Sequence, residues 1–445
     1  MNNILLIGAG RSASTLIEYL LNNSEKEQWK ITVAELSLDL AIKKINGHKN
    51  ASPLLFDINN DEQRTLEVQK ADLVISMLPA HMHIAVAKDC LTYKKHMVTA
   101  SYVSKEMQAL NQEAKKAGIT LMNEIGVDPG IDHMSAMKII DEIKAQGGKI
   151  ISFESFTGGL LAPESEKDNP WKYKFSWNPR NVILAGQGAV KFLHEGNYKY
   201  IPYHKLFRRT EILEVEGYGK FEGYANRDSI SYREVYDLND IRTIYRGTLR
   251  RPGYCKAWDV FVQLGATDDS YEIEDSENMT YREFIDSFLP HSPGDSVELK
   301  LSNYLKIDQD DFEIHEKLSW LGIFENTKVG LKKATPAQIL QHIMEQKWTL
   351  DKADKDMIVM VHKFEYELNG IKKHLQSSMV ITGDDTIQTA MSKTVGLPVA
   401  IAAKLILDGT IKDRGVLIPV SKSIYEPVLN ELKTYGIDFV EKIVE

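Results

Sequence analysis

Three small residues near the N-terminus, Gly8, Gly10 and Ala13, stand at the spacing of a nucleotide-binding turn. They follow an apolar run at residues 4–7 and precede a stretch with helical apolar spacing at residues 16–21. Gly8 permits a tight turn, Gly10 lets the backbone approach a diphosphate, and Ala13 lets the helix pack closely on the strand. Because a helix N-terminus carries partial positive charge, the pattern predicts a bound dinucleotide. The alternative is a strand–helix turn that binds nothing.

A carboxylate follows the second predicted strand. Residues 29–34 have the composition of a strand, and Glu35 comes directly after them. An acidic side chain at this place holds the ribose hydroxyls of a dinucleotide, whereas a 2′-phosphate would meet like charge. We therefore expect NAD to be preferred over NADP, although NADP remains possible.

Two arginines in turn-like settings are candidates for binding carboxylates. Arg227 stands in Tyr-Ala-Asn-Arg-Asp-Ser, and Arg250 ends the run Tyr-Arg-Gly-Thr-Leu-Arg. A guanidinium binds a carboxylate through two parallel hydrogen bonds. The commoner role of an arbitrary arginine is a surface ion pair, so the residues alone leave both roles open.

Asp128 and Tyr102 are candidates for acid–base chemistry. Asp128 lies just after the sixth predicted strand, where a carboxylate meets the nicotinamide end of a cofactor and a substrate amine. Tyr102 follows the fifth strand and can donate a hydrogen bond. The alternatives are a turn before Pro129 for Asp128 and a core position for Tyr102.

We expect no metal site. His81 and His83 lack a third ligand nearby and read as loop residues at a helix start, and His133 is more typical of a structural hydrogen bond. Cys90 and Cys255 lie far apart and lack the basic or histidine neighbours that activate a thiol, so we expect free thiols in a reducing compartment.

Alternating strands and helices must position the N-terminal candidates. Residues 1–150 alternate short β-rich runs with helical stretches, which is typical of a parallel sheet covered on both faces, with ligands at the carboxyl ends of its strands. The predicted strands are residues 4–7, 29–34, 53–56, 73–77, 97–100 and 119–122, and the predicted helices after the first are 60–68, 84–91, 105–117 and 132–146.

A second, β-rich domain begins near Ile150. We expect a helix-like run up to His194, several strands in residues 199–251 and a solvated acidic loop at residues 268–278. Further predicted elements are helices at 281–289, 312–321 and 335–348, the last capped by Thr335, a hairpin at 357–382 turning at Asn369-Gly370, and helices at 387–407 and 425–435.

Composition bounds the partners of the chain. Its 445 residues carry a formal charge of -9, which argues against nucleic acid or an anionic membrane as the main partner and favours a small molecule. The longest apolar stretch, residues 395–407, is short and contains Lys404, and no basic leader precedes the first strand. We expect a cytoplasmic protein.

Five motifs resemble those of the glutamate-forming saccharopine dehydrogenase family, in the same order and at near-identical spacing. They are Met122-Asn-Glu-Ile-Gly-Val-Asp-Pro-Gly-Ile-Asp-His133, Gly158-Gly-Leu with Ala162-Pro-Glu, Tyr173-Lys-Phe-Ser-Trp177, Asn226-Arg-Asp-Ser229 and Arg246-Gly-Thr-Leu-Arg250. The resemblance spans residues 1 to about 255, thins to about 385 and returns at residues 393–402.

The resemblance implies NAD(P)-dependent interconversion of saccharopine with L-glutamate and 2-aminoadipate 6-semialdehyde through an imine, a reaction of lysine metabolism. The implied cofactor contacts are Gly8, Ala9, Gly10, Arg11, Glu35, Leu36, Ser37, Asp57, Ile58, Leu78, Ala100, Ser101, Val127, Asp128, Pro129 and Asn178. The implied saccharopine contacts are Ser101, Tyr102, Asp128, Arg227, Thr248, Leu249 and Arg250. Asp128 and Tyr102 keep their candidate catalytic roles.

The expected fold class is α/β, with a Rossmann-type, doubly wound parallel sheet domain and a central α+β domain. We expect the first at residues 1–130 and 386–445, and the second at residues 131–385 with a small helical insertion at about 280–350. By family precedent, the central domain binds substrate and forms a homodimer.

Two departures and two alternatives accompany the resemblance. Thr157 stands where fungal relatives carry cysteine. The fungal relatives also carry a basic residue near the end of the second strand and prefer NADPH, whereas Glu35 is acidic. One alternative is a related dehydrogenase acting on another carboxyalkyl amine, such as carboxynorspermidine; the presence of Arg227 and Arg250 argues against it. The other is a catalytically silent dinucleotide-binding regulator, which the intact glycine turn and Asp128 disfavour.

Overall fold

The computed structural model describes residues 1–308 and 310–444, which form two compact units. Unit 1 comprises residues 1–150, 367–372 and 379–442, and unit 2 comprises residues 151–366, 373–378 and those from 443. Each unit has its own sheet and helices.

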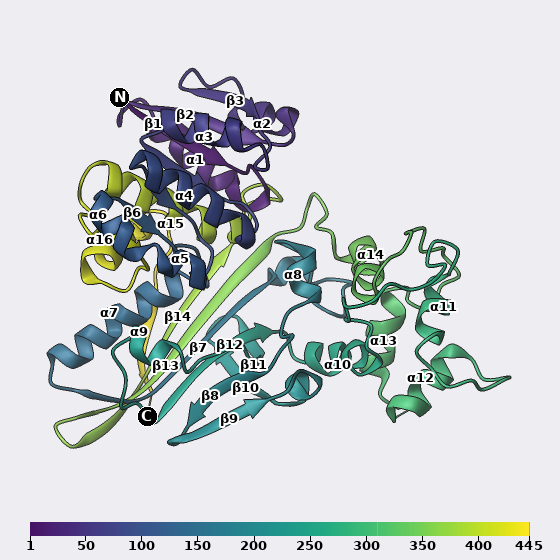
Figure 1. Ribbon diagram of the computed structural model, residues 1–445. Coiled ribbons are helices and arrows are strands. Elements are labelled where there is room, and N and C mark those ends of the chain that lie inside the picture. The colour runs from purple at the N-terminus through teal and green to yellow at the C-terminus, as the bar shows by residue number, and fades with distance from the viewer. Residues whose placement is uncertain (309, 445) are drawn as a thin grey trace. The chain divides into compact units, whose positions relative to one another are not determined.

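Unit 1 is built on a seven-stranded parallel sheet in the order β15-β6-β5-β4-β1-β2-β3 (Figure 1). Its strands are β1 (Asn2–Ile7), β2 (Trp29–Glu35), β3 (Ala51–Leu55), β4 (Leu73–Ser76), β5 (His96–Val98), β6 (Thr120–Met122) and β15 (Gly415–Leu417). The chain runs outward from β1 in both directions, which confirms the predicted Rossmann-type fold. The six predicted strands are present with small differences in their bounds, and β15 was not predicted.

Helices of unit 1 flank the sheet (Figure 1). They are α1 (Ser14–Asn23), α2 (Leu38–Ile45), α3 (Asp61–Lys70), α4 (His83–Tyr93), α5 (Lys105–Ala109), α6 (Asn111–Ala117), α7 (Ile131–Ala145), α15 (Ala390–Leu407) and α16 (Lys422–Thr434), with 3-10 turns at Arg11–Ala13 and Ala80–Met82. The boundary expected at residue 130 falls before α7, whereas this helix belongs to unit 1 because it packs against α16.

The apolar helix α15 packs against α1. A Cβ atom at Gly396 would lie 2.8 Å from the backbone nitrogen of Leu16, so the two helices approach too closely for a side chain there. By length and composition α15 could cross a membrane, but 78% of its apolar window is buried inside the structure. Its apolar surface therefore serves as core.

Unit 2 contains most of a nine-stranded sheet in which β10-β11-β12-β7-β13-β14-β16 are adjacent in that order and β8 pairs with β12 and β9. The strands are β7 (Lys149–Leu161), β8 (Val190–His194), β9 (Asn197–Ile201), β10 (Thr210–Val215), β11 (Gly219–Ala225), β12 (Thr243–Arg250), β13 (Asp356–Leu368), β14 (Ile371–Thr382) and β16 (Val440–Val444). Strand β12 is parallel to β7 and antiparallel to β11. Residues 190–194 were expected to be helical and instead form β8.

The helices of unit 2 surround an aromatic core that includes Trp171, Trp258 and Trp348. They are α8 (Pro179–Ile183), α9 (Tyr232–Val235), α10 (Tyr254–Leu264), α11 (Tyr281–Asp286), α12 (Val297–Leu305), α13 (Phe312–Trp320) and α14 (Pro336–Trp348), with 3-10 turns at Pro163–Ser165 and Tyr203–Arg208. Thr335 caps α14, as predicted, and its cap is a capping box with Gln338.

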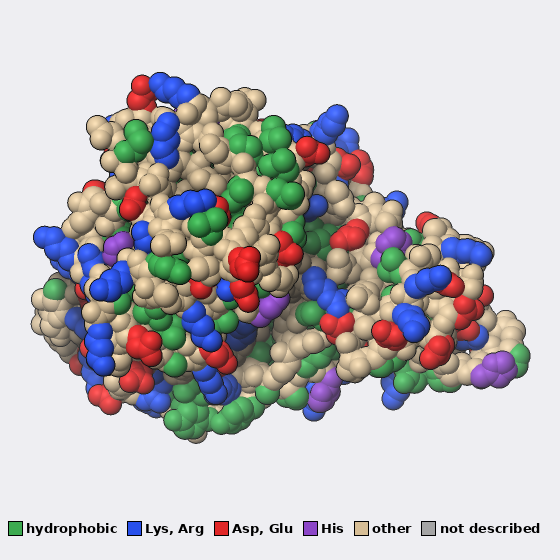
Figure 2. Space-filling view, turned by 45° about the horizontal axis from the view of Figure 1, so that its top comes forward, with side chains coloured by type: hydrophobic (Ala, Val, Ile, Leu, Met, Phe, Trp, Pro, Cys, Tyr) green, Lys and Arg blue, Asp and Glu red, His purple; other side chains and the backbone are tan. Residues whose placement is uncertain are grey.

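Charged side chains of both signs are interspersed on the face shown in Figure 2. Blue lysine and arginine side chains alternate there with red aspartate and glutamate side chains. The acidic balance of the sequence therefore does not come from one acidic patch on this face.

Candidate functional site

The predicted glycine turn joins β1 to α1 through a short 3-10 helix, Arg11–Ala13. Gly8 has a φ of +98°, and a Cβ atom on it would lie 3.0 Å from the carbonyl oxygen of Met77. Ala9 and Ala13 are buried, whereas Gly10 and Arg11 are exposed. Gly8 is therefore required both by its backbone conformation and by the closeness of β4's end.

Glu35 ends β2 and binds the glycine turn. One carboxylate oxygen, Oε2, accepts a hydrogen bond from the backbone N–H of Ala9 at 2.7 Å, and Oε1 accepts one from Leu36 N–H at 2.9 Å. Beyond it, Ser37 caps α2 by accepting a hydrogen bond from Leu40 N–H. The Glu35 side chain thus ties the end of β2 to the turn.

The other implied cofactor residues of unit 1 lie at the carboxyl ends of its strands. Asp57 and Ile58 follow β3, Leu78 follows β4, Ala100 and Ser101 follow β5, and residues 127–129 follow β6. Asp57 is exposed and its Oδ1 accepts hydrogen bonds from Asn59, while Ile58 is buried in the core. Asn178 belongs instead to unit 2, where its exposed side chain caps α8.

Glu124, a buried residue with a φ of +55°, connects the loop after β6 to the loop after β5 through hydrogen bonds. Its N–H donates to the carbonyl of Ser101 at 3.0 Å, and its Oε1 accepts from Val103 N–H at 2.9 Å. Its Oε2 lies 2.9 Å from Nε2 of the fully buried His133. Glu124 has no local signal in the sequence, because only the folded chain brings the two loops together.

The two connected loops bring Tyr102 beside Asp128. The Tyr102 hydroxyl donates a hydrogen bond to Oδ1 of Asp128 at 3.2 Å, and both side chains are partly exposed. The Asp128–Pro129 peptide bond is cis. The two candidate acid–base residues therefore form one pair at the carboxyl end of the sheet.

Arg227 lies on an anchored loop of unit 2, between β11 and α9. Its φ is +52°, in the left-handed region that a non-glycine residue rarely adopts. Hydrogen bonds hold the backbone on both sides: Arg227 accepts from Lys191 N–H at 3.1 Å, and the buried Ser229 hydroxyl accepts from Arg246 N–H at 2.9 Å. The loop thereby presents an exposed arginine from a fixed backbone.

Arg250 ends β12 and is only 4% exposed. Its guanidinium carbon lies 4.9 Å from the ring centre of Tyr173, 5.2 Å from that of Tyr254 and 5.9 Å from that of Tyr224. Burial raises the pKa of Tyr224 to about 12 and also raises the pKa of Tyr173 and Tyr254, so the rings are neutral. The cage stabilises the cation through ring faces rather than through anions.

The guanidinium of Arg250 has unused hydrogen-bonding capacity. One terminal N–H donates to the carbonyl of Leu249 at 2.8 Å, whereas Nε has no hydrogen-bond partner within residues 1–308 and 310–444. No carboxylate in that part of the chain forms an ion pair with it. A buried cation without an anion is costly, so this side chain fits an anionic ligand.

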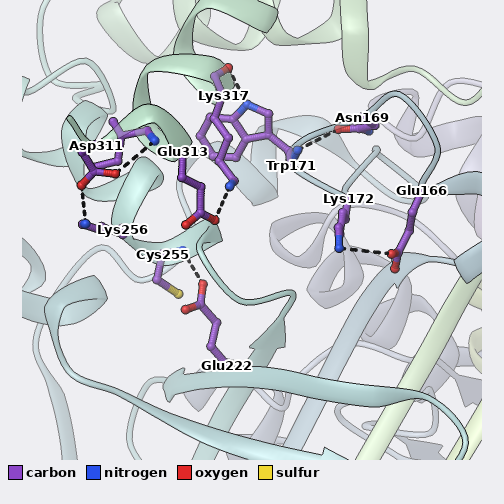
Figure 3. Close-up of polar contacts among 11 residues, drawn as sticks. Glu166, Asn169, Trp171, Lys172, Glu222, Cys255, Lys256, Asp311, Glu313 and Lys317 are labelled. Atoms are coloured by element: carbon purple, nitrogen blue, oxygen red, sulfur yellow. Dashed lines mark hydrogen bonds and ion pairs between the residues drawn. The ribbon is translucent and has the colours of Figure 1, made fainter. Parts of the chain in front are cut away.

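The helix that carries Tyr254 is held in place by the contacts drawn in Figure 3. The buried Glu222 carboxylate accepts a hydrogen bond from Cys255 N–H at 2.5 Å, which satisfies a donor at the start of α10. Lys256, the next residue, forms an ion pair with Asp311, the cap of α13. These contacts position the ring of Tyr254 over Arg250.

Thr248 and Leu249 precede Arg250 on β12, beside β7. Thr248 is directly opposite Thr157, whose hydroxyl oxygen is buried without a hydrogen-bond partner among the described residues. Leu249 is buried, and a Cβ atom at Gly158 would lie 2.6 Å from its carbonyl oxygen. Gly158 of β7 therefore allows β12 to approach closely.

The cysteines and the histidines of the His81–His83 segment show no arrangement for nucleophilic or metal chemistry among the described residues. Both cysteines are free and buried, and burial raises the pKa of each thiol. Across the described ranges, no group of three or more His, Cys, Asp or Glu side chains is arranged to hold a metal ion. His81 is exposed, whereas His83 begins α4 and is buried.

Comparison with known proteins identifies the family. A model described as "Saccharopine dehydrogenase NADP binding domain" matches residues 4–122, and one described as "Saccharopine dehydrogenase C-terminal domain" matches residues 126–437. The chain belongs to the saccharopine dehydrogenase family. Saccharopine dehydrogenase [NADP(+), L-glutamate-forming] of Pyricularia oryzae is 37% identical over 99% of both chains, and that of Saccharomyces cerevisiae is 36% identical over the same shares. The apo structure of the S. cerevisiae saccharopine dehydrogenase (L-Glu forming) covers 100% of both chains with a TM-score of 0.90 and 34% identity.

These findings correct the expected preference for NAD. The family model that matches the nucleotide-binding domain is described as NADP binding, and the fungal saccharopine dehydrogenases carry NADP(+) in their names. The prediction from Glu35 was wrong, because it assumed a carboxylate free to meet the ribose. In the structure both carboxylate oxygens accept hydrogen bonds from the backbone, at Ala9 and Leu36.

Proposed function

We propose that the chain catalyses the interconversion of saccharopine with L-glutamate and 2-aminoadipate 6-semialdehyde, with NADP as the nicotinamide cofactor. The observation that carries this proposal is Arg250: a buried guanidinium with an unpartnered Nε and no carboxylate partner in the described chain. Saccharopine has three carboxylates, so it supplies the anion that this site lacks. The full-length similarity to glutamate-forming enzymes supports the same substrate.

The turn around Gly8 fits a dinucleotide, because the space and backbone conformation at this position exclude a side chain. The diphosphate would be held by Gly8, Ala9, Gly10 and Arg11, and the rest of the cofactor by Leu36, Ser37, Asp57, Ile58, Leu78, Ala100, Ser101, Val127, Asp128, Pro129 and Asn178. When bound, the nicotinamide accepts or gives the hydride of a CH–NH oxidation or its reverse.

The protein's main task is then to orient a flexible substrate. Arg227 and Arg250 each pair with one substrate carboxylate. Thr248 and Leu249, which precede Arg250 on β12, contact the substrate beside it. Two gripped carboxylates fix the carbon that carries the secondary amine, which converts a loosely bound chain into one oriented for hydride transfer.

Asp128 and Tyr102 provide the acid–base chemistry. The secondary ammonium of saccharopine must lose a proton before oxidation, and the imine must then take up water. Asp128 accepts the proton at its carboxylate, and the hydrogen bond from the Tyr102 hydroxyl orients that carboxylate.

A spectrophotometric assay with the purified full chain tests this function. We expect saccharopine-dependent reduction of NADP, with L-glutamate formed in proportion to the reduced nicotinamide. The matched control is Arg250→Met, which removes the cation and keeps an apolar side chain for the tyrosine cage. Turnover of another carboxyalkyl amine without turnover of saccharopine would overturn the assignment.

A further inference from the structure

His83 is a buried histidine that connects three hydroxyl groups of unit 1. Its Nδ1 lies 2.8 Å from Oγ of Ser76, and its Nε2 lies 2.7 Å from Oγ of Ser101 and 3.3 Å from Oγ1 of Thr99. His83, Ser76 and Thr99 are each less than 5% exposed, whereas Ser101 is partly exposed at the carboxyl end of the sheet. The histidine thus lies behind the one hydroxyl of the group that a ligand can reach.

The ring of His83 is neutral at physiological pH. Burial, and to a smaller extent the nearby His81, lowers its pKa to about 4. A neutral imidazole has one N–H donor and one acceptor nitrogen, so the hydrogen bonds around it must determine which nitrogen carries the proton.

Counting hydroxyl protons selects the tautomer. If Nε2 carries the proton, it donates to Ser101 while Ser76 donates to Nδ1, and of the two buried hydroxyl groups only that of Thr99 lacks an acceptor for its proton. If Nδ1 carries the proton, Ser101 must donate to Nε2, because the lone pairs of two atoms only 2.7 Å apart cannot face each other, whereas the Thr99 contact is longer at 3.3 Å. The buried hydroxyl protons of both Ser76 and Thr99 then lack acceptors. Since unsatisfied buried donors are costly, the first arrangement is the stable one.

This tautomer leaves the hydroxyl proton of Ser101 available. The backbone of Ser101 is already fixed, because its N–H donates to Thr99 Oγ1 at 3.3 Å and its carbonyl accepts from Glu124 N–H at 3.0 Å. Only the direction of the hydroxyl proton remains to be set, and the N–H of His83 sets it by occupying a lone pair of Oγ.

We propose that His83 is a positioning residue that makes Ser101 a hydrogen-bond donor to a ligand oxygen, an inference that rests on the proposed function for the identity of the ligand. The acceptor is either a saccharopine carboxylate or the carboxamide oxygen of nicotinamide, both of which accept and cannot donate at that atom. Ser76 touches no ligand in this arrangement; its hydroxyl donates to Nδ1 of His83 and thereby stabilises the tautomer in which Nε2 carries the proton.

Two substitutions of His83 test the roles of the two ring nitrogens separately. His83→Gln places an amide N–H near the position of Nε2 and retains the contact to Ser101, whereas His83→Asn places its amide near Nδ1 and loses that contact. We expect His83→Asn to lower kcat/KM for saccharopine about 2- to 12-fold, the worth of one neutral hydrogen bond, and His83→Gln to recover most of it. Ser76→Ala should give a loss of the same direction, because it frees the ring to adopt the other tautomer.

A double-substitution cycle with Ser101→Ala gives the decisive readout. In the Ser101→Ala background, His83→Asn should have almost no further effect, since the hydroxyl that His83 orients is gone. The saccharopine KM and the NADP Kd, measured for each variant, show which ligand accepts the hydrogen bond. Additive losses, or equal losses in His83→Asn and His83→Gln, would refute the positioning role.

The outcome is distinguishable from failure of the proposed function. If the unsubstituted chain does not turn over saccharopine, the proposed function is wrong. The coupling between His83 and Ser101 can still be measured in that case, with the NADP Kd as the readout of the double-substitution cycle. Thermal midpoints show whether each variant folds. If His83→Asn does not fold, Ser76→Ala combined with Ser101→Ala tests the same coupling, and additivity there contradicts the inference.

Discussion

The Glu35 carboxylate oxygen Oε2 lies 2.7 Å from the backbone nitrogen of Ala9 and accepts its hydrogen bond. Through this contact the last residue of β2 holds the turn that follows β1, so the acidic side chain fixes the protein's own backbone. The Glu35 carboxylate therefore orders the glycine turn.

Removal of this contact should loosen the glycine turn. For Glu35→Ala we expect the Ala9 amide to exchange with deuterium roughly tenfold faster, because a hydrogen bond to a charged acceptor contributes about 1.5 kcal/mol at the lower end. Glu35→Gln retains an acceptor oxygen and should show a smaller effect. Hydrogen–deuterium exchange of the peptide covering residues 4–13 measures this, and unchanged protection in Glu35→Ala would show that the contact does not order the turn.

The two arginines should differ in how well lysine replaces them. Arg227 is exposed, whereas Arg250 is 4% exposed within its tyrosine cage. We expect Arg227→Met and Arg250→Met each to lower kcat/KM for saccharopine roughly 10- to 150-fold, since a charge-assisted pair contributes about 1.5 to 3 kcal/mol. Arg227→Lys should recover part of the loss, and Arg250→Lys little, because an ammonium in the cage cannot form the forked contact.

NADP affinity serves as the control for the arginine variants. Fluorescence titration should give the same NADP Kd for each variant as for the unsubstituted chain. A loss confined to NADP binding, or no loss in kcat/KM, would remove that arginine from the substrate site.

Much of the fold could be predicted because unit 1 repeats one pattern. The strands at residues 29–34 and 73–77 are apolar runs separated by amphipathic helices, and this alternation is sufficient to predict a parallel sheet. Strand β15 could not be predicted, because it lies outside the alternating N-terminal pattern and its partner β6 lies far away in sequence. The strand at residues 190–194 was missed because its apolar spacing fits a helix as well.

The candidate site could be predicted where a residue follows a strand end, and less well where tertiary contacts decide its role. Asp128 and Tyr102 were recognised from their positions after strands, but their shared hydrogen bond was not. Glu124 and His83 have no local signal, since their partners come from other loops. Residue type alone also gave the wrong role for Glu35, because the sequence does not show which way a side chain turns.

Asp128 should carry the proton transfer that precedes hydride transfer. For Asp128→Asn, which preserves shape and removes the charge, we expect kcat to fall about 10- to 100-fold and the acid limb of the kcat pH profile to disappear. Tyr102→Phe removes only the hydrogen bond to Asp128 and should cost about 2- to 12-fold. Steady-state kinetics across pH measure both. An unchanged kcat and pH profile in Asp128→Asn would leave Asp128 with a binding or turn-forming role only.

The burial of His83 makes the stability of the chain depend on pH. Burial, and secondarily His81, lowers the folded-state pKa from 6.5 to about 4. Between these values the unfolded chain binds a proton that the folded chain does not, so stability is lost as the pH falls from about 6.5 to 4. Integrated from pH 7 to pH 5, the contribution of His83 is about 2 kcal/mol. His96, whose pKa burial also lowers to about 4, acts in the same direction.

His83→Gln should therefore make the chain less sensitive to acid, because glutamine does not take up a proton in either state. We expect its Tm to fall less between pH 7 and pH 5 than the Tm of the unsubstituted chain, even though its Tm at pH 7 is lower through loss of the Ser76 hydrogen bond. His81→Gln, at an exposed position two residues earlier, is the matched control and should retain most of the pH dependence. Thermal unfolding at the two pH values measures the difference, and an equal fall in Tm for His83→Gln and the unsubstituted chain would show that His83 is not the buried neutral histidine described above.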